Sequence, residues 1–135
     1  MDCIFCKIIN HEIPNYTVYE NDHVLAFLDV QPCSKGHTVV IPKKHVSEIS
    51  ELSSEEWGSL LQGVREAAQK IEKVLNPQGM NIGINNKPAA GQAVAHTHWH
   101  IIPRYENDGG KSLHAIVQST EKIDVPQIAK LFTSV

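Results

Sequence analysis

The sequence has few cysteines, few aromatic residues and no excess of positive charge. Its 135 residues include 3 cysteines and 6% aromatic residues, and the formal net charge is -3. A basic nucleic-acid-binding surface is therefore not expected. A domain of this length buries enough surface to need no disulfide bridges, so we expect the cysteines to be metal ligands or free thiols.

Long hydrophobic runs are also missing from the sequence. No apolar run approaches the ~18 residues that a membrane-spanning helix needs. The first residues, Met1-Asp2-Cys3, lack the basic region and long apolar core of a signal peptide. We therefore expect a cytoplasmic protein without a membrane partner. The length is typical of one domain, and residues 1–135 are expected to form it without repeats or linkers.

The spacing of apolar residues predicts an α+β fold with a five-stranded antiparallel sheet. Strands are expected at 16–20, 23–30, 37–42, 80–86 and 95–104, and residues 113–118 are compatible with an edge strand. One long amphipathic helix is expected from Ser54 to Leu75, with a capping box from Ser53 to Glu56 and a stop at Asn76-Pro77. Short helices are expected near each end, at 3–9 and 126–132.

The most informative stretch is 95–104, where His96, His98 and His100 alternate with other residues. Successive side chains of a strand point to opposite faces, so we expect the three imidazoles on one face, ~6.6–6.8 Å apart. The residues between them should point into a core, and Pro103 should end the ladder pairing. Three imidazoles on one face can bind a metal or handle anionic phosphate groups.

Two of the cysteines have the spacing of zinc ligands. Cys3 and Cys6 form a C-x-x-C pair, and His45 and His96 would complete a Cys₂His₂ site. Four protein ligands leave no position for a zinc-bound water, so this zinc would be structural and would tie the N-terminus to the sheet. The alternative, in which the three histidines form a catalytic metal site, stays open. Cys33 has no partner in the sequence and is expected to be inert.

On the structural-zinc interpretation, His98 and His100 are free for chemistry. A neutral histidine can attack phosphorus if a hydrogen bond on one ring nitrogen orients the other. Attack at phosphorus needs mainly positioning and stabilisation of charge on the phosphoryl oxygens. Candidates for that stabilisation are the backbone N–H groups of residues 91–93, the Asn85 side chain and a protonated His100. The small residues of 87–94 also fit an ordinary hairpin connection.

These residues together resemble the signature of the histidine triad (HIT) family, in its Hint-like, bacterial-type branch. The signature is His96-x-His98-x-His100 followed by Ile101-Ile102-Pro103-Arg104. Other segments resemble the family in the right order: Phe5-x-Lys7-Ile8, Ala26 to Asp29, Gly36 to His45, and Gly91-Gln92-x-Val94-x-His96. The resemblance implies a homodimer of α+β subunits whose sheets join. It also implies a hydrolase or transferase that acts at the α-phosphate of a purine nucleotide.

The resemblance assigns roles position by position. His98 matches the nucleophile that forms a nucleotidyl-histidine intermediate, His100 the histidine that assists the leaving group, and His37 a supporting histidine. Asp29 matches the carboxylate that holds the ribose hydroxyls. The slot for the base matches Ile4, Phe5, Ile13 and Phe27, and the phosphate side matches Asn85, Gly91, Gln92 and Val94. The set Cys3, Cys6, His45 and His96 resembles the family's zinc site.

The sequence also departs from the pattern of its nearest branch. Ala93 stands where close relatives often have a phosphate-binding serine, and the chain ends without the tryptophan-bearing tail of some Hint enzymes. His100 stands where the transferase branches have glutamine, which favours hydrolysis. We therefore expect a nucleotide phosphoramidase or dinucleoside polyphosphate hydrolase that binds AMP-like purine nucleotides. The alternative is a nucleotide-binding scaffold or regulatory protein with little turnover.

Overall fold

The computed structural model describes residues 2–133 and 135. It contains a five-stranded antiparallel sheet with strand order β1-β2-β3-β5-β4. The strands are β1 Thr17–Glu20, β2 Val24–Leu28, β3 Thr38–Pro42, β4 Gly79–Ile84 and β5 Trp99–Arg104. The helices are α1 Ile4–Ile9, α2 Ser54–Leu75 and α3 Val125–Phe132, with short 3₁₀ turns η1 Ile49–Glu51, η2 Pro88–Ala90 and η3 Leu113–Ala115. The expected α+β class, the antiparallel sheet and the single long helix are confirmed.

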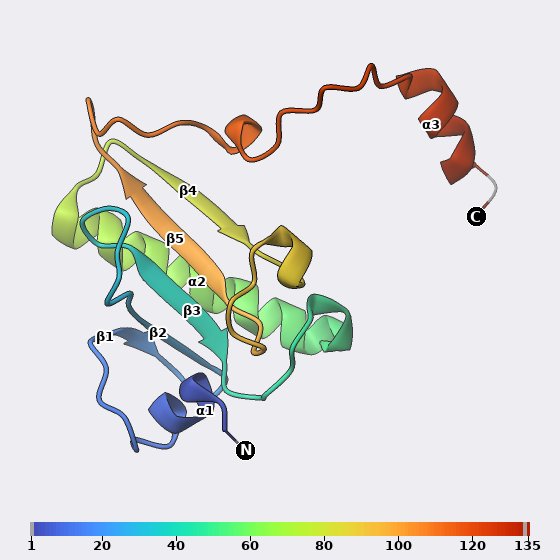
Figure 1. Ribbon diagram of the computed structural model, residues 1–135. Helices are drawn as coiled ribbons and strands as arrows, with labels where there is room; N and C mark the ends of the chain where they lie inside the picture. Colours follow the sequence, from blue (N-terminus) through green and yellow to red (C-terminus); the bar gives the residue numbers. More distant parts are fainter. Residues whose placement is uncertain (1, 134) are drawn as a thin grey trace.

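Helix α2 lies across one face of the sheet (Figure 1). The Ser53 hydroxyl accepts a hydrogen bond from the backbone N–H of Glu56, and Asn76 ends the helix in the left-handed conformation at φ 48°. The apolar stripe of α2 packs on β2, β3 and β5 in one cluster, which includes Leu60, Val64, Ala67, Ile71, Val24, Ala26, Val40 and Ile101. Each fully buried large aliphatic side chain contributes ~1.5–3 kcal/mol, so this face stabilises the fold most.

The short helix α1 lies on the opposite face. Phe5 and Ile8 of α1 pack against the other set of strand residues, Leu25, Phe27, Val39 and Ile41. Strands β2 and β3 are therefore buried on both faces, which explains why their sequences are continuous apolar runs rather than alternating ones. The consequence is that α1 brings the N-terminal cysteines to the face where the histidines lie.

Three local predictions about strands were wrong. Strand β5 begins only at Trp99, so His96 and His98 lie in the segment before it. Pro103 lies inside β5 opposite Met80, because β3 pairs with β5 only up to Ile101 and Pro103 has a strand neighbour on one side alone. Residues 113–118 form a 3₁₀ turn and irregular chain instead of an edge strand.

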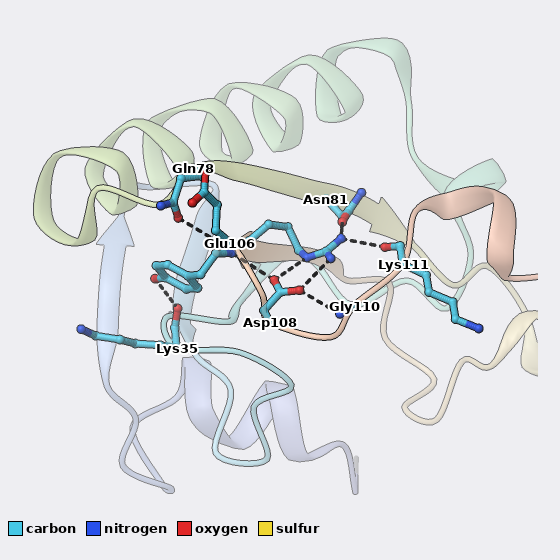
Figure 2. A network of polar contacts seen from close by, with 9 residues as sticks. Lys35, Gln78, Asn81, Glu106, Asp108, Gly110 and Lys111 are labelled. Atoms are coloured by element: carbon cyan, nitrogen blue, oxygen red, sulfur yellow. Dashed lines mark hydrogen bonds and ion pairs between the residues drawn. The ribbon is translucent and has the colours of Figure 1, made fainter.

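Arg104, the last residue of β5, contacts the segment of chain that follows the strand. Its guanidinium donates to both oxygens of Asp108 (2.8 and 2.9 Å), to the side-chain oxygen of Asn81 and to the carbonyl of Lys111 (both 2.7 Å), as Figure 2 shows. The Arg104 side chain lowers the pKa of the Asp108 carboxyl. These contacts hold residues 105–111 as a turn. The chain then runs away from the sheet to α3 (Figure 1), and no helix among the described residues is long and apolar enough to cross a membrane.

Two glycines of α2 offer a test of how closely the helix approaches the sheet. A Cβ atom at Gly63 would lie 2.4 Å from Val24 Cγ2, whereas one at Gly58 would meet nothing within 4 Å. We expect Gly63→Ala to lower the free energy of unfolding by ~1–3 kcal/mol through overpacking. We expect Gly58→Ala to raise it by ~0.5–1 kcal/mol through helix propensity. Urea unfolding of both variants measures the difference, and stabilisation by both would contradict this packing.

Candidate functional site

The polar groups of the site form two clusters, and Phe5 of α1 lies between them. The Phe5 ring packs edge-on against His96 on one side and His98 on the other, with ring centroids 5.8 and 5.1 Å apart. The first cluster contains Cys3, Cys6, His45 and His96, and the second contains His98, His100, His37 and Asp29. The structure therefore brings together the residues that the sequence analysis singled out, although only His100 of the triad lies within β5.

The first cluster has the dimensions of a tetrahedral zinc site. Its four ligand atoms lie within 4.8 Å of one another. The His45 and His96 Nδ1 atoms are 3.2 Å apart, and the sulfur–nitrogen distances are 3.3, 3.6 and 3.7 Å. Zinc bond lengths at tetrahedral angles imply roughly 3.4 Å between nitrogens and roughly 3.6 Å between sulfur and nitrogen. These four distances match those of a zinc site, and the residues therefore fit a zinc ion.

A backbone carbonyl fixes which nitrogen of His96 can bind a metal. The Nε2–H of His96 donates to the carbonyl of Pro42 at 2.9 Å, which leaves a lone pair on Nδ1. His96 is completely buried. Burial lowers the pKa of His96 and so favours the neutral ring that a metal needs.

A second backbone carbonyl orients His98. The Nδ1–H of His98 donates to the carbonyl of His96 at 2.8 Å, because a carbonyl can only accept. Nδ1 of the neutral ring therefore carries the proton, and Nε2 has a free lone pair. This is the tautomer that the sequence argument requires of a nucleophile.

His37 and His100 continue the cluster. The backbone N–H of Cys33 donates to Nδ1 of His37 at 3.2 Å, so the proton of neutral His37 is on Nε2. That N–H donates to Nδ1 of His100 at 3.0 Å, and the proton of His100 is then on Nε2. Asp29 Oδ2 lies 3.7 Å from His37 Nε2. Cys33 was expected to be inert, but its backbone N–H orients His37 and its Sγ lies 3.4 Å from the same His37 Nδ1 atom.

Two histidines of the second cluster, His100 and His37, have lowered pKa values, which favour their neutral rings. The pKa of His100 is lowered to about 4, chiefly by burial and to a smaller extent by the neighbouring rings of His98 and His37. Burial also lowers the pKa of His37, while Asp29 acts in the opposite direction. The protonated His100 of the sequence argument therefore requires a negatively charged ligand beside it.

A cavity of about 380 Å³ opens in front of His98 and His100. Its walls contain the residues expected to bind a base, a ribose and a phosphate: Ile4, Phe5, Ile13, Phe27, Asp29, Asn85, Gly91 and Val94. Ala93 is also in the wall, so the position expected to hold a serine faces the cavity without a hydroxyl. Gly91 adopts φ 99°, a conformation that favours glycine, beside the Asn85 side chain.

Gln92 is the one expected binding residue that is not in the cavity wall. Its side chain instead holds the loop together: it accepts from the backbone N–H of Lys87 (2.7 Å) and donates to the carbonyls of Ser47 (2.8 Å) and Val94 (3.0 Å). Sequence matching cannot separate a residue that contacts a ligand from one that supports the loop around it. Gln92 therefore positions the wall of the cavity.

Comparison with known proteins identifies the family. A family model described as the HIT domain matches residues 10–107. The chain is 53% identical over 107 residues to an uncharacterized HIT-like protein of Methanocaldococcus jannaschii, which covers 79% of this chain and 82% of the relative. It is 43% identical over 110 residues to an adenosine 5'-monophosphoramidase of Schizosaccharomyces pombe, which covers 82% of this chain and 80% of the relative.

A solved structure extends the likeness to the whole fold. A zinc-bound histidine triad family protein from Mycobacterium smegmatis aligns with a TM-score of 0.76 at 28% sequence identity, over 100% of this chain and 99% of that chain. The histidine motif, the sheet and the family match agree. The chain belongs to the HIT family.

Proposed function

We propose that the protein is a hydrolase that cleaves a purine nucleotide at its α-phosphate, with an adenosine phosphoramidate or a dinucleoside polyphosphate as substrate. The observation that carries the proposal is the tautomer of His98, whose Nε2 lone pair is available beside His100 in the wall of a cavity. The similarity to a relative named as an adenosine 5'-monophosphoramidase supports the same reaction class. Apolar residues of α1 and β2 would hold the base, and Asp29 the ribose.

The proposed reaction has two steps. His98 Nε2 forms a bond to phosphorus as the bond to the leaving group breaks, and the departing atom takes a proton from His100 Nε2–H. The negative phosphate raises the pKa of His100 in the complex, so this ring is protonated when the substrate is bound. Water then attacks the phosphorus, gives a proton to His100 and releases His98. The carbonyl of His96 stabilises the positive charge that develops on His98.

We also propose that the protein is a cytoplasmic homodimer with one structural zinc per subunit, held by Cys3, Cys6, His45 and His96. The distances in this cluster fit zinc, and a structural relative is described as zinc-bound. Zinc would fix the position of His96 and the N-terminus. The strand β4 lies at the end of the sheet, and its edge offers backbone groups with which a second copy could pair.

Replacement of the proposed nucleophile tests the reaction. We expect His98→Ala to lower AMP release from adenosine phosphoramidate by at least roughly 10⁴-fold, because no other group supplies the attacking nitrogen. The exposed His23 in the β1–β2 turn provides a matched control, and His23→Ala should retain wild-type turnover. Unchanged turnover in His98→Ala would contradict the mechanism. Tight AMP binding by a wild-type protein without turnover would favour the scaffold function, consistent with the missing hydroxyl at Ala93.

Zinc removal tests the first cluster. We expect chelation, or Cys3→Ser combined with Cys6→Ser, to remove the metal and lower the melting temperature by about 10 °C or more, because a ligand that binds only the folded state stabilises it. Cys33→Ser, the same change outside this cluster, should retain one zinc per chain. Metal analysis and thermal unfolding measure both effects. Loss of turnover on chelation without loss of stability would instead favour a catalytic metal.

The pH dependence of stability tests the burial of His100. Its folded pKa of about 4 lies below the ordinary 6.5, so between these values the unfolded chain binds a proton that the folded chain does not. The free energy of unfolding should therefore fall as the pH decreases from about 6.5 towards 4. The free energy of unfolding of His100→Gln should fall less steeply with decreasing pH than that of the wild type. The difference between the two slopes should be less than ~1.4 kcal/mol per pH unit, because the ring is partly exposed and water screens the effect.

Urea unfolding at several pH values measures these slopes. His23→Gln removes an exposed titratable ring and should keep the wild-type slope. Parallel pH profiles for His100→Gln and the wild type would show that His100 is not desolvated.

A further inference from the structure

The cavity in front of His98 has a polar side chain in its wall to which the proposed mechanism gives no role. Asn15 lines this cavity together with Asp29, to which the proposed function assigns the ribose. Asn15 follows Pro14 in the connection between α1 and β1, and it is partly buried. Its amide can both donate and accept hydrogen bonds, whereas an ionised carboxylate can only accept them.

The pairing of β1 with β2 places Asn15 opposite Asp29. The antiparallel ladder continues for one residue before β1, because the backbone N–H of Leu28 donates to the carbonyl of Tyr16 at 2.9 Å. The next residue is Asn15 on one chain segment and Asp29 on the other. Opposite residues of an antiparallel pair point to the same face, with Cβ atoms about 4.5–5.5 Å apart. Two side chains at this separation can contact the same sugar.

One end of the Asn15 amide already has a partner. The hydroxyl of Thr17 donates to Asn15 Oδ1 at 2.7 Å. The NH₂ group of Asn15 makes no hydrogen bond with any other residue of 2–133 and 135. The contact with Thr17 therefore leaves the donor end of the amide available to a ligand.

A ribose held by Asp29 needs such a donor. Asp29 Oδ1 accepts from the backbone N–H of Gln31 at 2.8 Å, and the carboxylate offers only acceptors to a ligand. Each ribose hydroxyl has one proton to donate and two lone pairs that accept. Asp29 can therefore accept the protons of the 2′- and 3′-hydroxyls but cannot donate to their oxygens. The free NH₂ group of Asn15 can supply that bond.

The other two amides in the cavity wall are placed differently. The Asn85 amide lies on the phosphate side, 3.7 Å from a Cβ atom built at Gly91. Gln31 is exposed and holds Asp29 through its backbone N–H. Asn15 is thus the amide that combines partial burial, a free NH₂ group and a position opposite Asp29.

We propose that Asn15 binds the ribose together with Asp29, and that this pair makes the site selective for ribonucleotides over nucleotides that lack the 2′- and 3′-hydroxyls. The Asp29 carboxylate accepts from the hydroxyls, and the NH₂ group of Asn15 donates to one of their oxygens. This role rests on the proposed nucleotide hydrolase and adds a specificity-determining residue to it. Because the role concerns binding, it can be tested without turnover.

Two nucleotides test the role of Asn15: AMP, and 2′,3′-dideoxy-AMP, which lacks both hydroxyls. Isothermal titration measures the affinity of the full chain for each. We expect Asn15→Ala to weaken AMP binding by roughly 3- to 10-fold, the loss expected of one neutral hydrogen bond, and to leave the binding of dideoxy-AMP unchanged. The preference for AMP should therefore fall by the same factor. Asn10→Ala makes the same change at the exposed end of α1, outside the cavity wall, and should keep both affinities.

The same titrations separate failure of the Asn15 role from failure of the nucleotide site. Equal weakening of both compounds in Asn15→Ala would mean that the amide contacts another part of the nucleotide, and would overturn the proposal. So would an unchanged preference in Asn15→Ala, including the case in which Gln31→Ala loses the preference instead. Either result would leave the nucleotide site itself intact. If the wild type bound neither compound, both the nucleotide site and the role of Asn15 would be overturned.

Discussion

The hydrogen bond from the His98 ring to the carbonyl of His96 is the interaction on which the chemistry of the site depends. A neutral imidazole has one proton and two nitrogens, and nothing within the ring selects between them. A carbonyl can only accept a hydrogen bond, so it selects the tautomer and aims the other nitrogen at the cavity. A backbone carbonyl also selects the tautomer of His96, whose Nε2–H donates to the carbonyl of Pro42. Backbone geometry thus fixes the tautomer that a metal ligand needs at His96 and the tautomer that the proposed nucleophile needs at His98.

His96 links the two clusters because it takes part in both. Its side chain belongs to the set of groups that fits zinc, and its carbonyl orients His98. Phe5 lies between the clusters and packs against both rings, and it is carried by the helix that follows Cys3. An ion bound at the first cluster would therefore hold the N-terminal helix, the base-binding wall and the nucleophile in one arrangement. A bound metal ion that takes no part in the proposed reaction could therefore still influence its rate by holding these groups in position.

Much of this arrangement could be predicted because it depends on local patterns. Helical spacing located α2 to the residue, and the alternation of His96, His98 and His100 placed the three rings in one region. The predictions that were wrong depended on the neighbouring strands, which the sequence pattern does not show. Strand β5 starts after His98, and Pro103 is tolerated inside it because pairing with β3 does not extend beyond Ile101. Cys33 contacts His37 through its thiol and through a backbone N–H, which every residue except proline has. A motif of side chains does not contain the backbone part of this contact.

The low pKa of His100 keeps its ring neutral when no anion lies beside it. An imidazolium kept permanently in this half-buried position would lose its hydration without a partner, and burial therefore holds the ring neutral while the cavity is empty. In the proposed reaction an anionic phosphate would supply the missing countercharge, so the proton that the leaving group needs would become favourable only with the substrate bound. Neutral His37 supports both states, because its Nε2–H can donate to Nδ1 of neutral His100 or turn towards Asp29, 3.7 Å away, when that nitrogen is protonated. In the proposed reaction, positive charge would therefore develop on His100 only when the transfer requires it.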